Sequence, residues 1–321
     1  MYDVKAMIQE ITSSKEIKNL SFTGVGGSLA CYYAAYYYVS REAKNITTSY
    51  TSSNEFVHDT PVCVGENSIV VIASRGGNTA ETVEAGRTAK KLGATVIGLT
   101  HEDGDTGIRQ VSDYTIVFED GDGVAFEVGK SAYIMKIAYE TLHAVEGTGR
   151  YEEMSAAMAK MNDLIPEASK AIVPEAIKFS IDYKDDKVIY TMGSGTAWSA
   201  AQQQTICIFM EMQWINSAVI HTGEFFHGPF EITDPDTAFL LLKSTGKTAA
   251  LDERAIRFLS RYNRHLTVID GEKYGLKELG DVSGYYDYDF YNCMLAVYNK
   301  LLADMRNHPL SKRKYMWKYN Y

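Results

Sequence analysis

The fold of this chain is decided by residues 69–83, IVVIASRGGNTAETV. An apolar run rich in Val and Ile predicts a strand that is buried on both faces. Gly76 and Gly77 then turn the chain, and a segment with helical spacing begins near Thr79. The stretch therefore predicts a strand–turn–helix unit of a parallel α/β sheet.

The same succession of apolar run, turn and helical segment recurs on both sides of this stretch. In the first half it predicts strands at residues 20–23, 69–74, 95–99 and 114–118, and helices at 28–41, 79–92 and 128–145. In the second half it predicts strands at 187–192, 239–243 and 266–269, and helices at 196–215, 251–262 and 288–305. The predicted fold class is α/β, with two mainly parallel sheets flanked by helices.

An internal repeat supports two domains. Two segments share one pattern, which is a strand, a G-x-G turn, a residue with a small hydroxyl side chain and a helix. They are FTGVGGSLACYYAAYYY, from Phe22, and YTMGSGTAWSAAQQQ, from Tyr190. Neither copy completes the dinucleotide fingerprint G-x-G-x-x-G, because Leu29 and Trp198 stand at its last position. With a break at EGTGR, residues 146–150, the predicted domains are 1–150 and 151–321.

Composition limits the classes of partner. The 321 residues are 45% hydrophobic and 23% charged, with a formal net charge of −9. This balance is typical of an ordered globular protein and argues against broad nucleic-acid binding, which needs a concentrated basic surface. The chain has no apolar stretch long enough for a membrane span or a signal sequence, and its four cysteines are widely scattered. We therefore expect a cytoplasmic protein with no membrane or nucleic-acid partner.

The turn after the apolar run suits a phosphate group. The hydroxyls of Ser74 and Thr79 can donate to phosphate oxygens, Gly76 allows close approach of the backbone, and Arg75 adds charge. The simpler interpretation is that Asn78 or Thr79 only caps the following helix. Local chemistry leaves both interpretations open.

The second half holds the acid–base candidates. Glu211 stands among Met210, Met212 and Trp214, and such apolar neighbours favour a carboxyl group that exchanges protons. His227 follows in an H-G-P motif, and Glu224 lies three residues before it as a competing carboxylate. The spacing does not match HExxH, so we expect no catalytic metal.

Residues 74–82, SRGGNTAET, resemble the S-x-S-G-x-T-x-E-T phosphosugar signature of the sugar isomerase (SIS) family. The resemblance covers both halves and implies two SIS domains. It places Ser74, Arg75, Gly76 and Thr79 in the phosphate loop and implies that Ser28 supplies a further hydroxyl. Gly76 departs from the pattern because many members have serine there.

The second half resembles the isomerase half of glucosamine-6-phosphate synthase, in which a glutamate precedes the histidine of an H-G-P motif by sixteen residues. Glu211 and His227 have this spacing. The resemblance implies that Glu211 moves a proton between C1 and C2 of the sugar and that His227 helps to open its ring. Whether Glu211 or Glu224 carries that proton stays open.

Within the SIS family the likeness is closest to the fructosamine-6-phosphate deglycase branch. It rests on NEFVH at 54–58, FHGPFE at 226–231, HPL at 308–310 and the basic, aromatic end of the chain. It implies water-dependent release of glucose 6-phosphate and an amine from a phosphorylated sugar-amine conjugate, such as fructoselysine 6-phosphate, without a cofactor. It also implies a homodimer with the active site at the subunit interface, and a C-terminal segment that closes over it and brings Lys312 near the sugar.

Two alternatives remain at this point. The first is another SIS enzyme, either an aldose–ketose phosphosugar isomerase or a deglycase for a different conjugate. The second is a non-catalytic phosphosugar-binding regulator, which would be expected to carry a basic DNA-binding segment. Which amine is released is not encoded in any motif of the chain.

Overall fold

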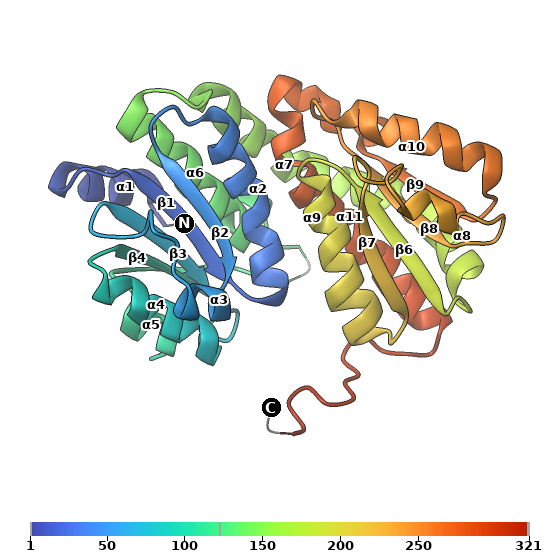
Figure 1. Ribbon diagram of the computed structural model, residues 1–321, viewed down its shortest axis with the longest axis horizontal. Helices are drawn as coiled ribbons and strands as arrows, with labels where there is room; N and C mark the ends of the chain where they lie inside the picture. The colour runs from blue at the N-terminus through green and yellow to red at the C-terminus, as the bar shows by residue number, and fades with distance from the viewer. Residues whose placement is uncertain (1, 122, 320–321) are drawn as a thin grey trace. The chain divides into compact units, whose positions relative to one another are not determined.

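The computed structural model describes residues 2–121 and 123–319. It forms two compact units, Met1–Asn162 and Asp163–Tyr321 (Figure 1). Their boundary falls inside helix α7 (Tyr151–Ala171), which begins in the first unit and ends in the second. Residues 146–150, the break in the sequence, lie just before that helix.

In the part of the first unit that is described, the centre is a five-stranded parallel sheet in the order β2-β1-β3-β4-β5. The six residues of β3 are all buried, as the apolar run predicts. The strands are β1 (Asn19–Gly24), β2 (Thr47–Ser52), β3 (Ser68–Ala73), β4 (Thr95–Thr100) and β5 (Tyr114–Val117).

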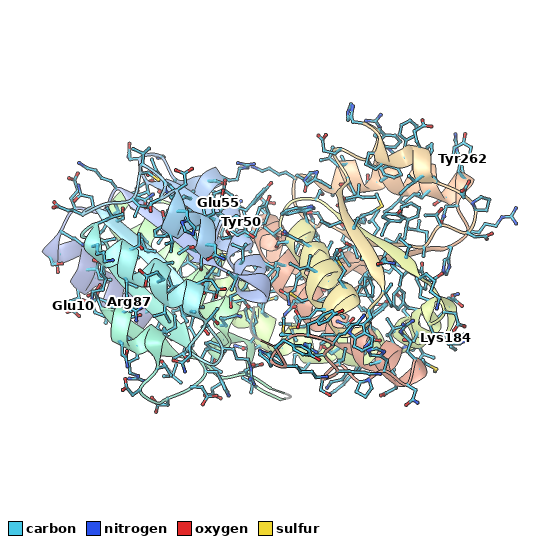
Figure 2. The ribbon with its side chains drawn as sticks, turned by 60° about the horizontal axis from the view of Figure 1, so that its bottom comes forward. Glu10, Tyr50, Glu55, Arg87, Lys184 and Tyr262 are labelled. Atoms are coloured by element: carbon cyan, nitrogen blue, oxygen red, sulfur yellow. The ribbon has the colours of Figure 1, made fainter. Side chains whose placement is uncertain are left out.

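Two groups of helices pack in the first unit, one with α1, α2 and α6 and the other with α3, α4 and α5 (Figure 1). Polar side chains such as Glu10 and Arg87 project outward from these helices (Figure 2). The helices are α1 (Val4–Ser14), α2 (Gly26–Glu42), α3 (Ser53–His58), α4 (Ala80–Lys91), α5 (Gly107–Val111), the 3-10 turn η1 (Phe126–Val128) and α6 (Lys130–Glu146).

The second unit repeats the design. Its described residues form a four-stranded parallel sheet in the order β7-β6-β8-β9, which matches the order of the first four strands of the first unit. The strands are β6 (Val188–Gly193), β7 (Asn216–His221), β8 (Phe239–Lys243) and β9 (Leu266–Asp270).

The helices of the second unit complete the repeat. Helix α11 packs against α8 and α9, while Ala255 and Leu259 of α10 join a core with Met192, Phe239 and Leu241 of the sheet. The elements are α8 (Val173–Tyr183), α9 (Ala197–Gln203), the π-helix η2 (Gln204–Met212), the 3-10 segments η3 (Pro229–Ile232), η4 (Gly271–Tyr274) and η5 (Leu276–Tyr285), α10 (Ala249–Tyr262) and α11 (Asp287–Met305).

The predicted fold class is confirmed, but two strands escaped prediction. Strands β2 and β7 are the outer partners of β1 and β6, and most of their residues are only partly buried, so neither shows a continuous apolar run. The helix predicted over 196–215 ends at Met212, and β7 follows. Within the described residues, no helix combines the length and the apolarity needed to cross a membrane.

Candidate active site

The first sheet has a topological switch point between β1 and β3. Strand β1 pairs with β2 on one side and with β3 on the other, so the connections leaving β1 and β3 diverge. In open α/β sheets, ligands bind at the carboxyl ends of strands beside such a point. Residues 74–79 follow β3, and Ser28 lies at the start of α2 after β1. The predicted phosphate residues therefore lie where this fold binds ligands.

The loop of residues 74–79 presents its hydroxyl groups to each other. The Oγ of Ser74 and the Oγ1 of Thr79 lie 2.8 Å apart, and the backbone N–H of Thr79 points to the Ser74 hydroxyl at 3.4 Å. Thr79 is the N-cap residue of α4, but its side chain does not cap the helix. An oxyanion at this end of α4 would meet two hydroxyls and the positive end of the helix dipole.

The two glycines of the loop have different roles. A Cβ atom at Gly76 would meet no atom within 4 Å, so a serine side chain fits there. Gly77 has φ +70°, and a Cβ atom at this position would lie 2.5 Å from the Cβ of Thr106. Gly77 is therefore required by the turn, whereas Gly76 leaves open space above the loop.

The charged groups near the loop differ from the sequence interpretation. Arg75 directs its guanidinium to Asp120, with Nε 2.6 Å from the carboxylate, and both side chains are well exposed. A cation that the sequence did not single out lies at the start of α6, where the Nζ of Lys130 is 3.2 Å from the Oγ of Ser28. The ammonium group of Lys130 therefore lies beside Ser28, whereas the guanidinium of Arg75 is paired with Asp120.

The second unit carries a matching loop whose donors are already occupied. Ser244 follows β8 as Ser74 follows β3, and Thr248 is the N-cap residue of α10 as Thr79 is that of α4. The carboxylate of Asp287 accepts from the Ser244 hydroxyl at 2.7 Å and from the Thr245 hydroxyl at 2.6 Å. In the second unit, a carboxyl group of the chain itself therefore accepts the hydrogen bonds of this loop.

A second buried carboxylate adjoins this loop. Asp252, on α10, accepts from the hydroxyls of Thr222 and Ser194 and from the backbone N–H of Ser244, at 2.6 to 2.9 Å. Burial raises the pKa of Asp252 from 3.8 to about 6 and that of Asp287 from 3.8 to about 7, and the hydrogen bonds only partly oppose this. These groups stay hydrogen-bonded inside the unit, so we assign them to its stability.

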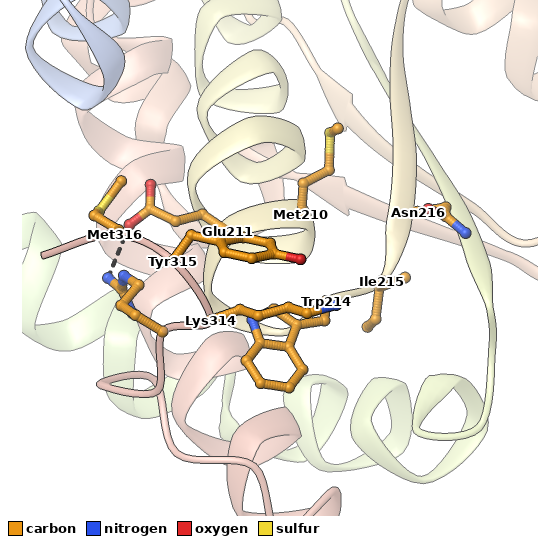
Figure 3. Close-up of a pocket in the computed structure, with 9 residues that line it drawn as sticks. Met210, Glu211, Trp214, Ile215, Asn216, Lys314, Tyr315 and Met316 are labelled. Carbon is orange, nitrogen blue, oxygen red and sulfur yellow. Dashed lines mark ion pairs between the residues drawn. The ribbon is translucent and has the colours of Figure 1, made fainter. Parts of the chain in front are cut away.

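The predicted proton carrier Glu211 lies on the π-helix η2, near the start of β7. Segments of π-helix are rare and occur often at functional sites. Met210 and Trp214 are largely exposed, so the surroundings of Glu211 are less apolar than its sequence neighbours indicate. Instead, the Oε1 of Glu211 lies 2.8 Å from the Nη2 of Arg313, in an ion pair that is largely buried (Figure 3).

The pocket that Glu211 lines does not include His227. Glu211 lines a pocket with Asn216, the first residue of β7, whereas His227 lies in the turn that follows His221, its last residue. The ring of Phe226, the residue before His227, packs on Phe258 of α10, so this turn runs along α10. Glu224 and His227 share the same exposed turn, in which the backbone N–H of His227 donates to the Glu224 carbonyl oxygen at 2.9 Å.

The end of the chain forms one wall of the pocket beside Glu211. The pocket has a volume of about 430 Å³ and is lined by Met210, Glu211, Trp214, Ile215, Asn216, Arg313, Lys314, Tyr315 and Met316 (Figure 3). Lys312, the predicted contact, instead lies with its Nζ 5.0 Å from the ring centre of Trp214. The residue that reaches Glu211 is Arg313, and the basic run 312–314 gave no means of choosing it.

Comparisons with known proteins agree with this architecture. Residues 15–144 match the SIS domain family. The chain is 36% identical over 320 residues to the fructosamine deglycase FrlB of Bacillus subtilis (strain 168), covering 99% of this chain and 97% of that protein. It is 22% identical to the fructoselysine 6-phosphate deglycase of Escherichia coli (strain K12), over 83% of this chain and 77% of that protein. A crystal structure of a candidate phosphosugar isomerase from Salmonella typhimurium LT2 is 44% identical, with a TM-score of 0.96 over 99% of this chain and 96% of that one.

Proposed function

The chain belongs to the SIS-domain family, and on this premise we propose that it is a fructosamine-6-phosphate deglycase. The reaction consumes a 6-phosphorylated fructosamine and water and yields glucose 6-phosphate and a free amine. The observation that carries the proposal is the hydroxyl-bearing loop of residues 74–79 at the switch point of the first sheet. Fructoselysine 6-phosphate is the specific substrate that we propose, in line with the name of the Escherichia coli relative.

The phosphate is bound in the first unit. Ser74 and Thr79 donate their hydroxyl hydrogens to its oxygens, and the N-terminus of α4 stabilises its charge. Ser28 and Lys130 add a hydroxyl and an ammonium group on the α2 side of the same sheet edge. Binding through the phosphate leaves C1 and C2, at the other end of the open sugar, for the chemistry.

Glu211 is the proposed proton carrier. It removes a proton from C1 while the C2 carbonyl becomes an enol hydroxyl, and delivery of a proton to C2 then forms a C1=N imine. Water adds to C1, the C–N bond breaks, and the amine leaves with its electron pair and a proton. The nitrogen of the substrate carries the positive charge of the imine, so the sequence of steps needs no electron-accepting cofactor. His227 assists the opening of the sugar ring.

The active site is proposed to lie between two copies of the chain in a homodimer. The pocket that Glu211 lines does not include His227, which agrees with a histidine supplied by a second copy. In a two-fold symmetric dimer, both copies contribute the same residues to the interface, so two equivalent sites result. Each site then combines Glu211 of one copy with His227 of the second.

The test is turnover of fructoselysine 6-phosphate by the purified chain, with glucose 6-phosphate followed in a coupled assay. The wild type is expected to be active, and Glu211→Gln to lose about 100- to 10,000-fold in kcat, the usual contribution of a general acid–base group. Glu224→Gln is the matched control and is expected to retain activity. If Glu224→Gln were inactive and Glu211→Gln active, the proton carrier would be Glu224. If the wild type released no glucose 6-phosphate but interconverted a ketose and an aldose phosphate, the activity would be isomerisation instead.

A further inference from the structure

The C-terminal segment, residues 306–319, is held against the end of η2 that carries Glu211. The side-chain amide of Gln213 donates to the carbonyl oxygen of His308 at 2.7 Å. The ring of Trp214 meets the ring of His308 edge-on, with the ring centres 4.7 Å apart. Gln213 is completely buried, so this contact belongs to the interior of the second unit. The segment therefore reaches the pocket beside Glu211 from a fixed starting point.

Arg313 is the residue of this segment that pairs with Glu211, and its guanidinium is itself held in place. Nη1 donates to the carbonyl oxygens of Leu310 at 2.7 Å and Lys312 at 3.0 Å. The guanidinium also lies 5.1 Å from the ring centre of Trp317. Arg313 is 8% exposed, so little of it is open to water. Its own segment therefore fixes the direction from which Nη2 approaches the carboxylate.

The ion pair uses one oxygen of the Glu211 carboxylate and leaves the other. Nη2 of Arg313 lies 2.8 Å from Oε1 (Figure 3), while Oε2 makes no hydrogen bond or ion pair within the residues that the structure describes. The side chain of Glu211 is 24% exposed and lines the pocket of about 430 Å³. One oxygen is thus anchored, and the second is left for a group that enters the pocket.

A carboxylate that moves a proton must be placed accurately. A glutamate side chain has three rotatable bonds and loses conformational entropy when it is fixed in one rotamer. If it is fixed before the substrate binds, that loss does not add to the barrier of the reaction. A displacement of about 1 Å from the reactive geometry can lower a rate about 100-fold. A catalytic base that is oriented by a further group is a common arrangement in enzymes.

We propose that Arg313 is the positioning residue for Glu211 and holds Oε1 so that Oε2 faces C1 of the sugar-amine conjugate. This inference rests on the proposed deglycase function. Arg313 acts through Glu211 and does not contact the substrate. When Oε2 takes the proton from C1, Oε1 still accepts from Nη2, so the proton stays on the oxygen that faces the sugar and is delivered to C2 from there.

The test is a double-mutant cycle on kcat with fructoselysine 6-phosphate. Glu211→Asp shortens the side chain by one C–C bond, about 1.5 Å, which keeps a carboxylate and breaks the ion pair. Arg313→Gln is expected to lower kcat about 10- to 100-fold in the chain with Glu211. In the Glu211→Asp background it is expected to change kcat by less than about threefold, because the pair is already lost. Titration with glucose 6-phosphate counts the folded sites, so that each kcat refers to folded protein.

Affinity for glucose 6-phosphate separates positioning from a general structural role. The phosphate is proposed to bind in the first unit, so Arg313→Gln should keep the wild-type Kd within about threefold while its kcat falls. The matched control is Arg261→Gln, which removes an exposed arginine from the last turn of α10 in the same unit and should leave both quantities unchanged.

Equal losses from Arg313→Gln in the two backgrounds would show that Arg313 acts independently of Glu211 and would overturn this inference. A wild-type kcat in Arg313→Gln, or a Kd that rose as far as kcat fell, would also overturn it. Each of these results would leave the deglycase proposal intact, because the wild type would still turn over the substrate. Absence of turnover by the wild type would overturn both proposals.

Discussion

Glu211 precedes β7 in the chain and His227 follows it, and both residues belong to the second unit with that strand. Their placement does not depend on how the two units are arranged. The proposed function places both side chains at one sugar in a site shared by two chains. This proposal is open to a direct test.

Mixing two inactive variants should restore activity. Glu211→Gln and His227→Asn are each expected to be inactive as homodimers, because every site then lacks one of its two groups. In a mixed dimer, one site has both wild-type residues and the other has neither. Random reassociation at equal concentrations should recover about a quarter of the wild-type activity. The measurement is glucose 6-phosphate release after the variants are unfolded together and refolded.

The control for complementation is a mixture of Glu211→Gln with Glu211→Ala, which shares one defect and should stay inactive. If the first mixture also stayed inactive while its dimers formed normally, both residues would have to act within one chain. That result would contradict the proposed interface site.

Loss of the Thr79 hydroxyl should weaken phosphate binding. Thr79→Val keeps the side-chain shape and removes the hydroxyl that faces Ser74, so the Kd for glucose 6-phosphate should rise about 10- to 100-fold. Thr79→Ser keeps the hydroxyl and should remain within about threefold of wild type. Isothermal titration of both variants makes the comparison. Equal affinities in the two would mean that Thr79 serves only the start of α4.

The two neighbouring glycines should respond differently to serine. Gly76→Ser places its Cβ in open space and should fold with wild-type stability, while its hydroxyl adds a donor above the loop. Gly77→Ser must take φ +70° and press on Thr106, so it should lose about 1 to 2 kcal/mol from backbone strain and more from the contact. Thermal melts give the order of stabilities, and the opposite order would contradict the geometry of the turn.

The free energy of unfolding should depend on pH because Asp252 has a raised pKa in the folded chain. Its pKa is raised from 3.8 to about 6 in the folded chain, so between these values the folded state binds more protons than the unfolded state. The free energy of unfolding therefore falls as the pH rises through this window. At 1.36 kcal/mol per pKa unit, the contribution of Asp252 is about 3 kcal/mol.

Asp252→Asn isolates this contribution because all other titrating groups except the neighbouring Asp287 are nearly unchanged. The stability advantage of the wild type over the variant should shrink by about 3 kcal/mol between about pH 4 and pH 7. Urea unfolding at several pH values measures it. A difference that is constant with pH would show that Asp252 titrates normally in the folded protein.

The sequence predicted the strands that carry an apolar run, including the partly buried β9, and missed β2 and β7, in which such a run is absent or short. Strand β3 is buried along its whole length and has a continuous apolar run, so its pattern is visible without the structure. In β2, TTSYTS, the first residue is exposed and the rest are only partly buried, so the selection for apolar side chains is weak. Strand β7, NSAVIH, was missed because its apolar run, residues 218–220, is short.

The candidate site was predictable where it depends on local order along the chain. The loop of residues 74–79 follows a strand directly and precedes a helix, so its donors can be placed from sequence alone. Arg313 and Lys130 lie 102 residues from their partners Glu211 and Ser28, and no local pattern marks either of them. Such partners are set by how helices and segments pack in three dimensions.

Asp287 gives the repeated fold an asymmetry between its halves. Two loops of one design face the carboxyl edges of two similar sheets, and one of them holds a carboxylate that is part of the chain. That half has a permanently bound carboxyl group whose local concentration no metabolite level can change. A loop whose donors bind a side chain of the same unit is filled at any concentration of a dissolved ligand.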